Sequence, residues 1–220
     1  MSFSPGSRNR LTERDLPRFP GESLFDKVAR AVCRAGCLPR KELYEAWEVA
    51  RRVRRKHRGG RVVDVACGHA LAAHLMLLLD DSSPHAIAID PDPPPSSARI
   101  AEVLVETWPR LADRVTIRTA RLAEVTLEPA DVVISIHACG SLTDDVLAAA
   151  IAARARVAVL PCCHEHVSLP LAGWLGDALA LDVRRAHRLE AAGYAVATQT
   201  IDPAITPKHR LLIGTPDQYQ

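Results

Sequence analysis

Aromatic side chains and excess charge are both scarce in this chain of 220 residues. Phe, Trp and Tyr together make up 4% of the sequence, and the formal net charge at pH 7 is +2. Few aromatic rings leave few platforms on which single-stranded bases could stack, and the chain as a whole lacks the basic balance of many nucleic-acid-binding domains. Hydrophobic residues make up 48% of the sequence. That content excludes an intrinsically disordered chain and is enough for a folded core.

Long hydrophobic runs are absent as well. The longest apolar stretch, Leu71 to Leu79, is shorter than the ~20 residues of a membrane-spanning helix and is interrupted by His74. The N-terminal segment is polar and rich in Pro, Ser and Arg, without the apolar core of a secretory signal. We therefore expect no membrane partner and a cytoplasmic location.

No pair of cysteines has the Cys-x-x-Cys spacing of a zinc ribbon or a thioredoxin-like redox site. In a reducing cytoplasm the six cysteines are expected to remain thiols. They are Cys33, Cys37, Cys67, Cys139, Cys162 and Cys163. Their positions need an explanation other than disulfide or zinc-ribbon chemistry.

The composition changes twice along the chain and divides it into three segments. Residues 1–21 contain three prolines and few apolar positions, so we expect a flexible arm. Residues 22–58 carry apolar residues at helical spacing, including Leu43, Trp47 and Ala50, and are expected to form an N-terminal helical cap. Residues 59–220 begin at two consecutive glycines, which stop the preceding helix.

The third segment alternates short β-branched runs with helical stretches, a pattern typical of βαβ units around a largely parallel sheet. The last two predicted strands are joined by a connection too short for a helical crossover, so we expect them to pair antiparallel. The predicted strands are Arg61–Val65, His85–Ile89, Arg114–Arg118, Asp131–Ile136, Arg156–Leu160, Tyr194–Ile201 and Arg210–Ile213, with helices near residues 70–80, 97–108, 143–153 and 170–191. The pattern predicts an α/β fold with a seven-stranded, Rossmann-like sheet and an N-terminal helical segment, which is the outline of the class I methyltransferase fold.

The first predicted strand ends in an acid, Asp64, and is followed by small residues at alternate positions: Ala66, Gly68 and Ala70. This resembles motif I of S-adenosylmethionine (SAM) methyltransferases, Asp/Glu-x-Gly-x-Gly-x-Gly, with only the middle glycine retained. The two alanines are small enough for close backbone approach to a ligand, although alanine adopts positive φ less readily than glycine. The absence of Gly-x-Gly-x-x-Gly disfavours NAD. The resemblance implies that Asp64 anchors the methionine amino group through water, with Ala66 and Gly68 beside the cofactor.

Asp90 closes the second predicted strand, 22 residues after Gly68. A carboxylate at this place can accept hydrogen bonds from both hydroxyls of a nucleoside ribose. Asp is also a common turn initiator, and Asp90 begins the proline-rich turn that follows the strand. The first loop and the strand count favour the ribose-binding interpretation. We expect Arg121 and Leu122, after the third strand, to lie near the adenine.

Histidines and cysteines gather after the fourth and fifth predicted strands. His137 and Cys139 follow the fourth, and Cys162, Cys163 and His164 follow the fifth. Neighbouring parallel strands lie ~4.8 Å apart, so these loops can bring the five side chains into one pocket. In a fold of this class the transferred methyl group points into that pocket. The alternatives are a small buried hydrophobic role for Cys139 and a core position for His137.

Two motifs in this region resemble one family. They are His-x-Cys-Gly-x-x-Thr-Asp, beginning at His137, and Pro-Cys-Cys-His, beginning at Pro161. Both resemble the methyltransferase-domain family that includes the eukaryotic zinc-finger-bearing tRNA ribose 2′-O-methyltransferases, and the Ile-Thr-Pro-Lys-His-Arg segment around Lys208 resembles that family's closing segment. The resemblance implies a SAM-dependent methyltransferase domain over residues 59–220, with Asp64, Gly68 and Asp90 on the cofactor. Around the acceptor it implies His137, which also borders the cofactor, and Cys139, Gly140, Pro161, Cys162, Cys163 and His164.

The sequence leaves the methyl acceptor open. A ribose hydroxyl needs removal of its proton, which His137 or Lys208 could assist, whereas a thiol or imidazole needs less help. The basic segment Arg51 to Arg61 could contact RNA phosphates or could be a solvated helix end, where cations interact with the helix dipole. The chain lacks the zinc-finger extension of the tRNA enzymes. A small-molecule or protein acceptor with a thiol or nitrogen nucleophile is therefore the alternative.

A non-catalytic function is the remaining alternative. His137, Cys162, Cys163 and His164 could hold zinc or sense the redox state. Adjacent cysteines seldom chelate one tetrahedral ion well, because structural zinc sites space their pairs by about two to four residues. We therefore expect a site without metal. The sequence predicts neither the oligomeric state nor the partner of the N-terminal segment.

Overall fold

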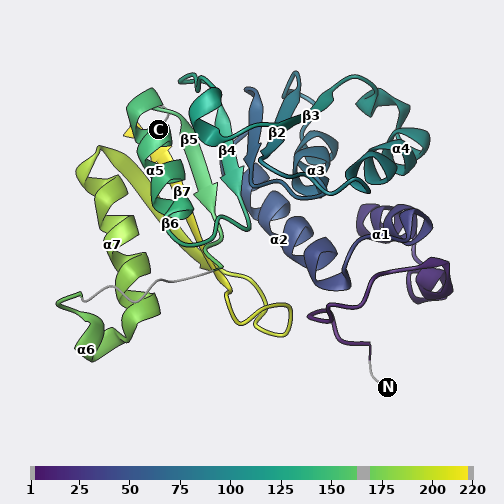
Figure 1. Ribbon diagram of the computed structural model, residues 1–220, viewed down its shortest axis with the longest axis horizontal. Coiled ribbons are helices and arrows are strands. Elements are labelled where there is room, and N and C mark those ends of the chain that lie inside the picture. Colours follow the sequence, from purple (N-terminus) through teal and green to yellow (C-terminus); the bar gives the residue numbers. More distant parts are fainter. Residues whose placement is uncertain (1–2, 163–168, 218–220) are drawn as a thin grey trace.

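The computed structural model describes residues 3–162 and 169–217 (Figure 1). Its seven-stranded sheet has the order β3-β2-β1-β4-β5-β7-β6. The strands β1 to β5 pair in parallel, and β7 runs antiparallel to both β5 and β6. The strands are β1 (Val62–Val65), β2 (Ala86–Asp90), β3 (Val115–Thr119), β4 (Val132–Ser135), β5 (Arg156–Val159), β6 (Tyr194–Thr200) and β7 (Arg210–Pro216). The predicted sheet, with its terminal antiparallel hairpin, is confirmed.

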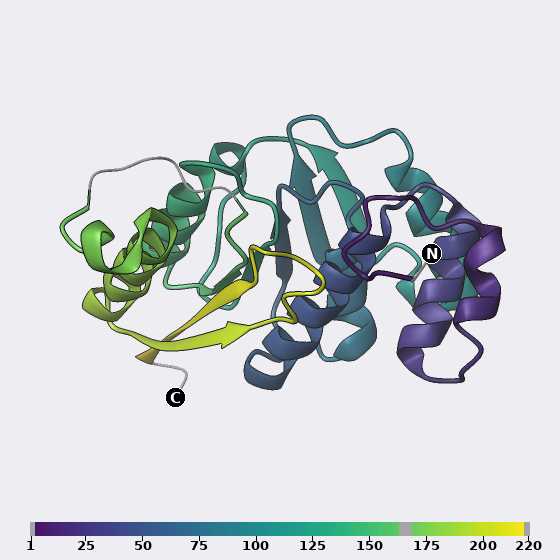
Figure 2. The ribbon, with the colours of Figure 1, turned by 90° about the horizontal axis from the view of Figure 1, so that it is seen from below.

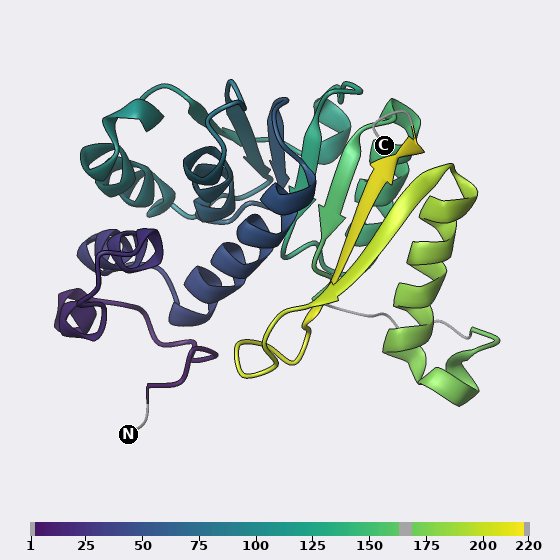
Figure 3. The same ribbon diagram turned by 180° about the vertical axis from the view of Figure 1, so that it is seen from behind.

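Helices cover both faces of the sheet. One face carries α1 (Leu24–Ala35), α2 (Arg40–Lys56), α3 (Leu71–Leu79) and α4 (Ser97–Thr107), and the other carries α5 (Leu142–Ala153) and α7 (Asp177–Ala191). Figure 3 shows α1 and α7 at opposite ends of the molecule, with the β6–β7 hairpin beside α7. Because side chains alternate along a strand, Val132 and Ile134 of β4 pack toward α2 and α3, whereas Val133 packs toward α5.

The helix expected over residues 170–191 is divided in two. A short helix, α6 (Ala172–Leu175), precedes α7, and Gly176 separates them with φ of +73°. Glycine adopts this backbone without the steric cost of a Cβ atom. Within the residues that the structure describes, no helix combines the length and apolar character needed to cross a bilayer.

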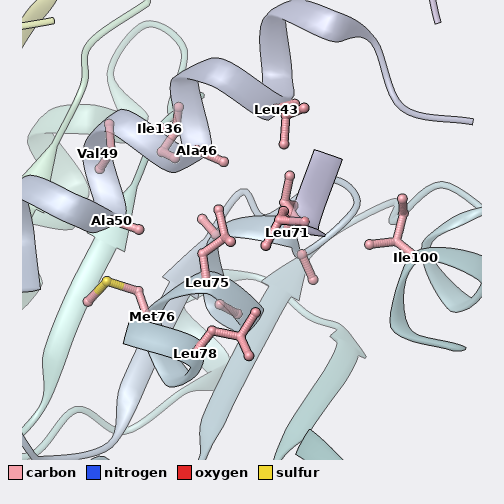
Figure 4. Close-up of a cluster of buried hydrophobic side chains, with 14 of the residues drawn as sticks. Leu43, Ala46, Val49, Ala50, Leu71, Leu75, Met76, Leu78, Ile100 and Ile136 are labelled. Atoms are coloured by element: carbon pink, nitrogen blue, oxygen red, sulfur yellow. The ribbon is translucent and has the colours of Figure 1, made fainter. Parts of the chain in front are cut away.

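The N-terminal helical segment shares its core with the sheet. Helix α2 packs along α3, and the facing side chains are fully or almost fully buried (Figure 4). They include Leu43, Ala46, Val49 and Ala50 of α2 and Leu71, Leu75 and Met76 of α3. Burial of each large aliphatic side chain contributes about 1.5 to 3 kcal/mol, so α2 is held firmly to the domain.

The segment predicted as a flexible arm is packed where the structure describes it. Leu11 and Phe19 are buried in the same core as α1 and α2. The backbone carbonyls of Ser7 and Asn9 accept hydrogen bonds of 2.9 Å from the first N–H groups of α2. Those N–H groups have no partner inside a helix, and Pro39 at the N-cap has no side chain that could accept from them. The arm therefore caps α2 instead of extending into solvent.

The arm also reaches the loop between the last two strands. A Cβ atom at Gly6 would lie 2.6 Å from the carbonyl oxygen of Ala204, so no larger residue fits there without movement. Figure 2 shows the N-terminal arm and the β6–β7 loop on the same side of the molecule. The N-terminal arm and the β6–β7 loop thus meet near the carboxyl edge of the sheet.

Candidate active site

The loop after β1 has three residues in left-handed backbone conformation at alternate positions. The φ angles are 55° at Ala66, 49° at Gly68 and 56° at Ala70. These are the positions of the three glycines in motif I. An L-alanine in this region costs roughly 1 to 2 kcal/mol. The loop thus adopts the glycine geometry without two of its glycines, and the space beside the Cα of Gly68 is open.

Asp64 lies under this loop, 2% exposed, and accepts a hydrogen bond of 3.1 Å from the backbone N–H of Ala73 in α3. Burial raises the pKa of the Asp64 carboxyl to about 7. The Ala73 hydrogen bond opposes this shift of the pKa, and the negative charge of Asp90 adds to it. A cation placed at this loop would favour the ionised form of Asp64.

Asp90 joins the first loop to the second. One carboxylate oxygen accepts from the backbone N–H of Gly68 at 3.1 Å, and the other accepts from the N–H of Asp92 at 3.0 Å. The second bond makes Asp90 a turn initiator, as the sequence alternative suggested. The first bond places its carboxylate against the motif-like loop.

A cavity of about 850 Å³ opens beside these loops. Its walls are formed by residues at the ends of β1, β2 and β3 and in the first two turns of α5. They include Val65, Ala66, Ile89, Pro91, Ala120, Arg121, Leu122, Leu142 and Asp145. The structure thus brings Arg121 and Leu122 into one cavity with Ala66. Ligand pockets typically measure about 300 to 1,000 Å³.

His137 lies beyond the end of β4 and faces α2. Its Nε2 is 3.6 Å from a carboxylate oxygen of Glu45, and the His137 side chain is 39% exposed. Glu45 is 2% exposed, and its other oxygen is 3.2 Å from the ammonium of Lys41. Glu45 is not among the site residues predicted from the sequence. The sequence does contain an indication of its role: Glu45 lies on the same helix face as the buried Val49, where an acid interrupts the apolar pattern.

The thiols of Cys139 and Cys162 meet where β4 and β5 end. Their Sγ atoms are 2.9 Å apart, and Cys139 is exposed. Cys163 and His164, predicted in the same pocket, lie outside the described residues. Lys208 is exposed on the β6–β7 loop, and none of the hydrogen bonds or ion pairs of the described residues joins its side chain to His137 or Cys139.

Other residues of the His-x-Cys-Gly-x-x-Thr-Asp motif hold the loop in shape. The hydroxyl of Thr143 donates to the carbonyl of Ala138 at 2.7 Å. Asp144 forms an ion pair of 2.8 Å with Arg185, which is 1% exposed, and Gly140 has φ of 58°. The motif therefore contains candidate site residues, His137 and Cys139, and also residues that stabilise the conformation of their loop.

The basic segment Arg51 to Arg61 lies away from this edge. It spans the end of α2 and leads into the amino end of β1, whereas the candidate site lies at the carboxyl ends of the strands. Several of its arginines pair within the fold: Arg51 and Arg52 with Glu48, Arg54 with Asp80, and Arg61 with Asp131. Among the described residues no three His, Cys, Asp or Glu side chains gather as metal ligands.

Comparison with known families identifies the class. A family described as a methyltransferase domain matches residues 41–169, more than half of the chain. The chain belongs to this family and is a class I methyltransferase domain, an enzyme class that uses SAM as the methyl donor. The search of curated proteins found no match.

Solved methyltransferase structures share the fold. An O-methyltransferase family protein from Burkholderia thailandensis has 17% identity over 94% of this chain and 63% of that chain, with a TM-score of 0.53. A ribosomal protein L11 methylase from Lactobacillus delbrueckii subsp. bulgaricus has 12% identity over 78% of this chain and 76% of that one, with a TM-score of 0.51. A precorrin-6y C5,15-methyltransferase from Geobacter metallireducens has 17% identity over 77% and 87%, with a TM-score of 0.50. The chain thus spans 63% of the length of the Burkholderia protein. At these levels of sequence identity, the structural similarity establishes a shared fold.

Proposed function

We propose that this domain binds SAM across the ends of β1, β2 and β3 and supports methyl transfer to a nucleophile held near His137. The observation that supports the proposal is the junction between the loop after β1 and the cavity. Ala66, the first of the three left-handed residues, lines the 850 Å³ cavity together with Arg121 and Leu122. The open space at Gly68 leaves room for a ligand against the backbone.

The residues present fit this cofactor. Asp90, held beside Gly68, has lone pairs left for the ribose hydroxyls. Asp64 would favour the cationic methionine amino group, because a nearby cation stabilises its ionised form. The apolar walls at Ile89 and Leu122 suit the faces of an adenine ring. When bound, SAM supplies an electrophilic methyl carbon for an in-line displacement.

At the acceptor side we assign general-base assistance to His137. The ring is half-buried at the end of β4, and imidazole is the side chain best suited to proton transfer near neutral pH. Cys139 and Cys162 would form the adjoining wall of the acceptor pocket. Cys163 and His164 are proposed in the same wall from the sequence, and Lys208 is proposed from the sequence as a second group that assists removal of the acceptor's proton.

We propose a small-molecule or protein acceptor with an oxygen, nitrogen or thiol nucleophile. The segment Arg51 to Arg61 gives little support to an RNA track, because its arginines are partly neutralised by Glu48, Asp80 and Asp131 and lie toward the amino end of β1. A tRNA ribose hydroxyl, which the motif likeness puts forward, would have to reach His137 by another surface.

Calorimetry with SAM tests the cofactor site. Loss of a charge-assisted hydrogen bond costs about 1.5 to 3 kcal/mol, so we expect Asp90→Ala to weaken SAM binding by roughly tenfold or more. Asp92→Ala is the matched control, since Asp92 is an exposed acid in the same turn. Equal affinity of folded Asp90→Ala and wild-type protein would remove Asp90 from the site.

Labelled SAM then tests the acceptor. The wild-type protein is incubated with separate fractions of small molecules, proteins and RNA, and label transfer to each fraction is counted. We expect transfer to the small-molecule or protein fraction, with His137→Gln retaining SAM affinity and losing turnover. Transfer to RNA alone would overturn the proposed acceptor while leaving the cofactor site intact.

A further inference from the structure

Helix α2 places a carboxylate inside an otherwise apolar contact. Glu45 shares the buried helix face with Ala46 and Val49 and is 2% exposed. A buried charge costs several kcal/mol unless it is paired or hydrogen-bonded. An acid at such a position therefore needs a partner that compensates for its burial.

Only one of the two Glu45 oxygens is accounted for by its own helix. Oε1 lies 3.2 Å from the Lys41 ammonium, one turn earlier. Oε2 is buried and has no hydrogen-bond partner among the described residues. It faces Nε2 of His137 at 3.6 Å, just beyond hydrogen-bond length. A small rotation of the imidazole would complete a carboxylate–imidazole pair.

The neighbouring acid on the same helix has a different histidine as its partner. Glu42, one turn before Glu45, lies 3.4 Å from Nδ1 of His69, and the opposite nitrogen of that ring lies 3.0 Å from the hydroxyl of Ser96. His69 thus has a partner on each side. His137 has Glu45 on its Nε2 side, which leaves Nδ1 as the nitrogen available to a ligand.

We propose that Glu45 is the positioning residue for His137, a role that deepens the proposed function and rests on it. The carboxylate holds the ring with Nε2–H directed toward α2 and stabilises the imidazolium once it forms. In the transfer, a lone pair of the acceptor bonds to the methyl carbon, and the electrons of the broken carbon–sulfur bond stay on sulfur. The acceptor's proton moves to Nδ1 of His137 and then to solvent.

Proton NMR of the His137 ring tests the pair without any acceptor. The resonance is assigned by its absence in His137→Gln and followed across pH in the wild type and in Glu45→Gln, which keeps the shape and removes the charge. We expect the titration of the resonance to move to lower pH in Glu45→Gln, because the imidazolium loses its counter-charge. Glu42→Gln is the matched control on the same helix and should leave the His137 titration unchanged.

Turnover on the acceptor found by the labelling screen tests the positioning role itself. We expect Glu45→Gln to lower kcat by at least about tenfold, part of the 10² to 10⁴-fold that a general base contributes, with SAM affinity unchanged. Glu45→Asp keeps the charge but sets the carboxylate back by one methylene, so its kcat should lie between those of Glu45→Gln and the wild type. If Glu45→Gln does not fold, a kcat of Glu45→Asp below that of the wild type, with SAM affinity unchanged, is the expected result. An unchanged His137 titration, or an equal shift in Glu42→Gln, would overturn the role of Glu45. Absence of SAM binding by the wild type would instead remove the proposed function, while the NMR result would still report on the pair.

Discussion

At the scale of single residues, the loop after β1 stores strain in two alanines. Ala66 and Ala70 hold φ angles that cost an L-residue roughly 1 to 2 kcal/mol. The loop keeps this conformation because the helix α3 and the strand β1 on either side are buried and fix its ends. Backbone strain that the surroundings enforce is typical of ligand-binding loops.

Replacing one of these alanines by glycine should relieve that strain. We expect Ala66→Gly to leave the free energy of unfolding unchanged or to raise it by up to about 1 kcal/mol, because relief of strain offsets the greater freedom of glycine in the unfolded chain. Ala149 is half-buried in the helix α5 and lines the same cavity, so Ala149→Gly should lower stability by roughly 0.5 to 1 kcal/mol. Urea unfolding of the two variants measures the contrast. Equal losses would show that Ala66 is not strained.

Ionisation of the buried Asp64 carboxyl lowers the free energy of unfolding at neutral pH. Its pKa is about 7 in the folded protein and about 3.8 in the unfolded chain, so the folded state binds more protons between these values. Stability from this group is therefore present at low pH and is lost as pH rises toward 7, by about 1.4 kcal/mol per pH unit at most. We expect Asp64→Asn to be more stable than wild type, with a gain that grows from pH 4 to pH 7 and then levels. Chemical unfolding across pH measures the gain, and a constant difference at all pH values would contradict it; Asp92→Asn is the exposed control.

At the scale of elements, the helix α2 packs against the core of the domain and also contributes residues to the candidate site. Its middle packs on α3, its N-terminus receives the arm, and its acids face the loops after β1 and β4. The apolar stripe of residues 22–58 predicts a helical cap, and we propose that this cap lies over the acceptor side of the cleft. The contact between Glu45 and His137 is consistent with that proposed role.

Removal of the N-terminal segment tests this double role. A chain that begins at Gly59 would expose the apolar surface of α3, including Leu71, Leu75 and Met76, which are buried now. Because contiguous exposed apolar surface promotes association, we expect this truncation to aggregate or unfold. Size-exclusion chromatography and circular dichroism provide the measurement. A soluble, folded truncation with normal SAM affinity would show that α2 contributes only to the acceptor side.

At the scale of the whole molecule, buried polar groups connect distant parts of the chain. His57, just after α2, is 1% exposed, and its Nε2 is 2.9 Å from the hydroxyl of Thr215 in β7. Burial, together with the charges of Arg156, Arg54 and Lys56, lowers the pKa of His57 to about 3. The ring therefore stays neutral in the folded protein.

This arrangement makes the whole fold sensitive to acid. The unfolded chain binds a proton at His57 near pH 6.5, whereas the folded state does so near pH 3, so stability falls as pH falls between these values. The slope is about 1.4 kcal/mol per pH unit for one proton. We expect His57→Gln to reduce the slope of the unfolding free energy between pH 4.5 and 6.5, whatever its effect on absolute stability. His187→Gln, on an exposed ring, should leave the slope unchanged, and an unaltered slope in His57→Gln would contradict the assignment.

Local patterns in the sequence were sufficient for the architecture. Alternating β-branched runs predicted the seven strands, and Asp64, Gly68 and Asp90 could be proposed as site residues because they lie at or just after the ends of those strands. Period and strand-end position are properties of neighbouring residues, so the sequence by itself determines them.

Only the tertiary structure determined which distant segments of the chain contact one another. Three features join segments that are distant in sequence: the placement of the buried Glu45 beside His137, the partial neutralisation of the basic segment by Asp80 and Asp131, and the capping of α2 by the arm. A side chain's partner across such a distance depends on how layers of helices pack on the sheet, which no local period encodes. For the same reason the sequence shows Glu45 only as an acid that interrupts the apolar face of a helix, and its partner, His137 at the end of β4, is known only from the structure.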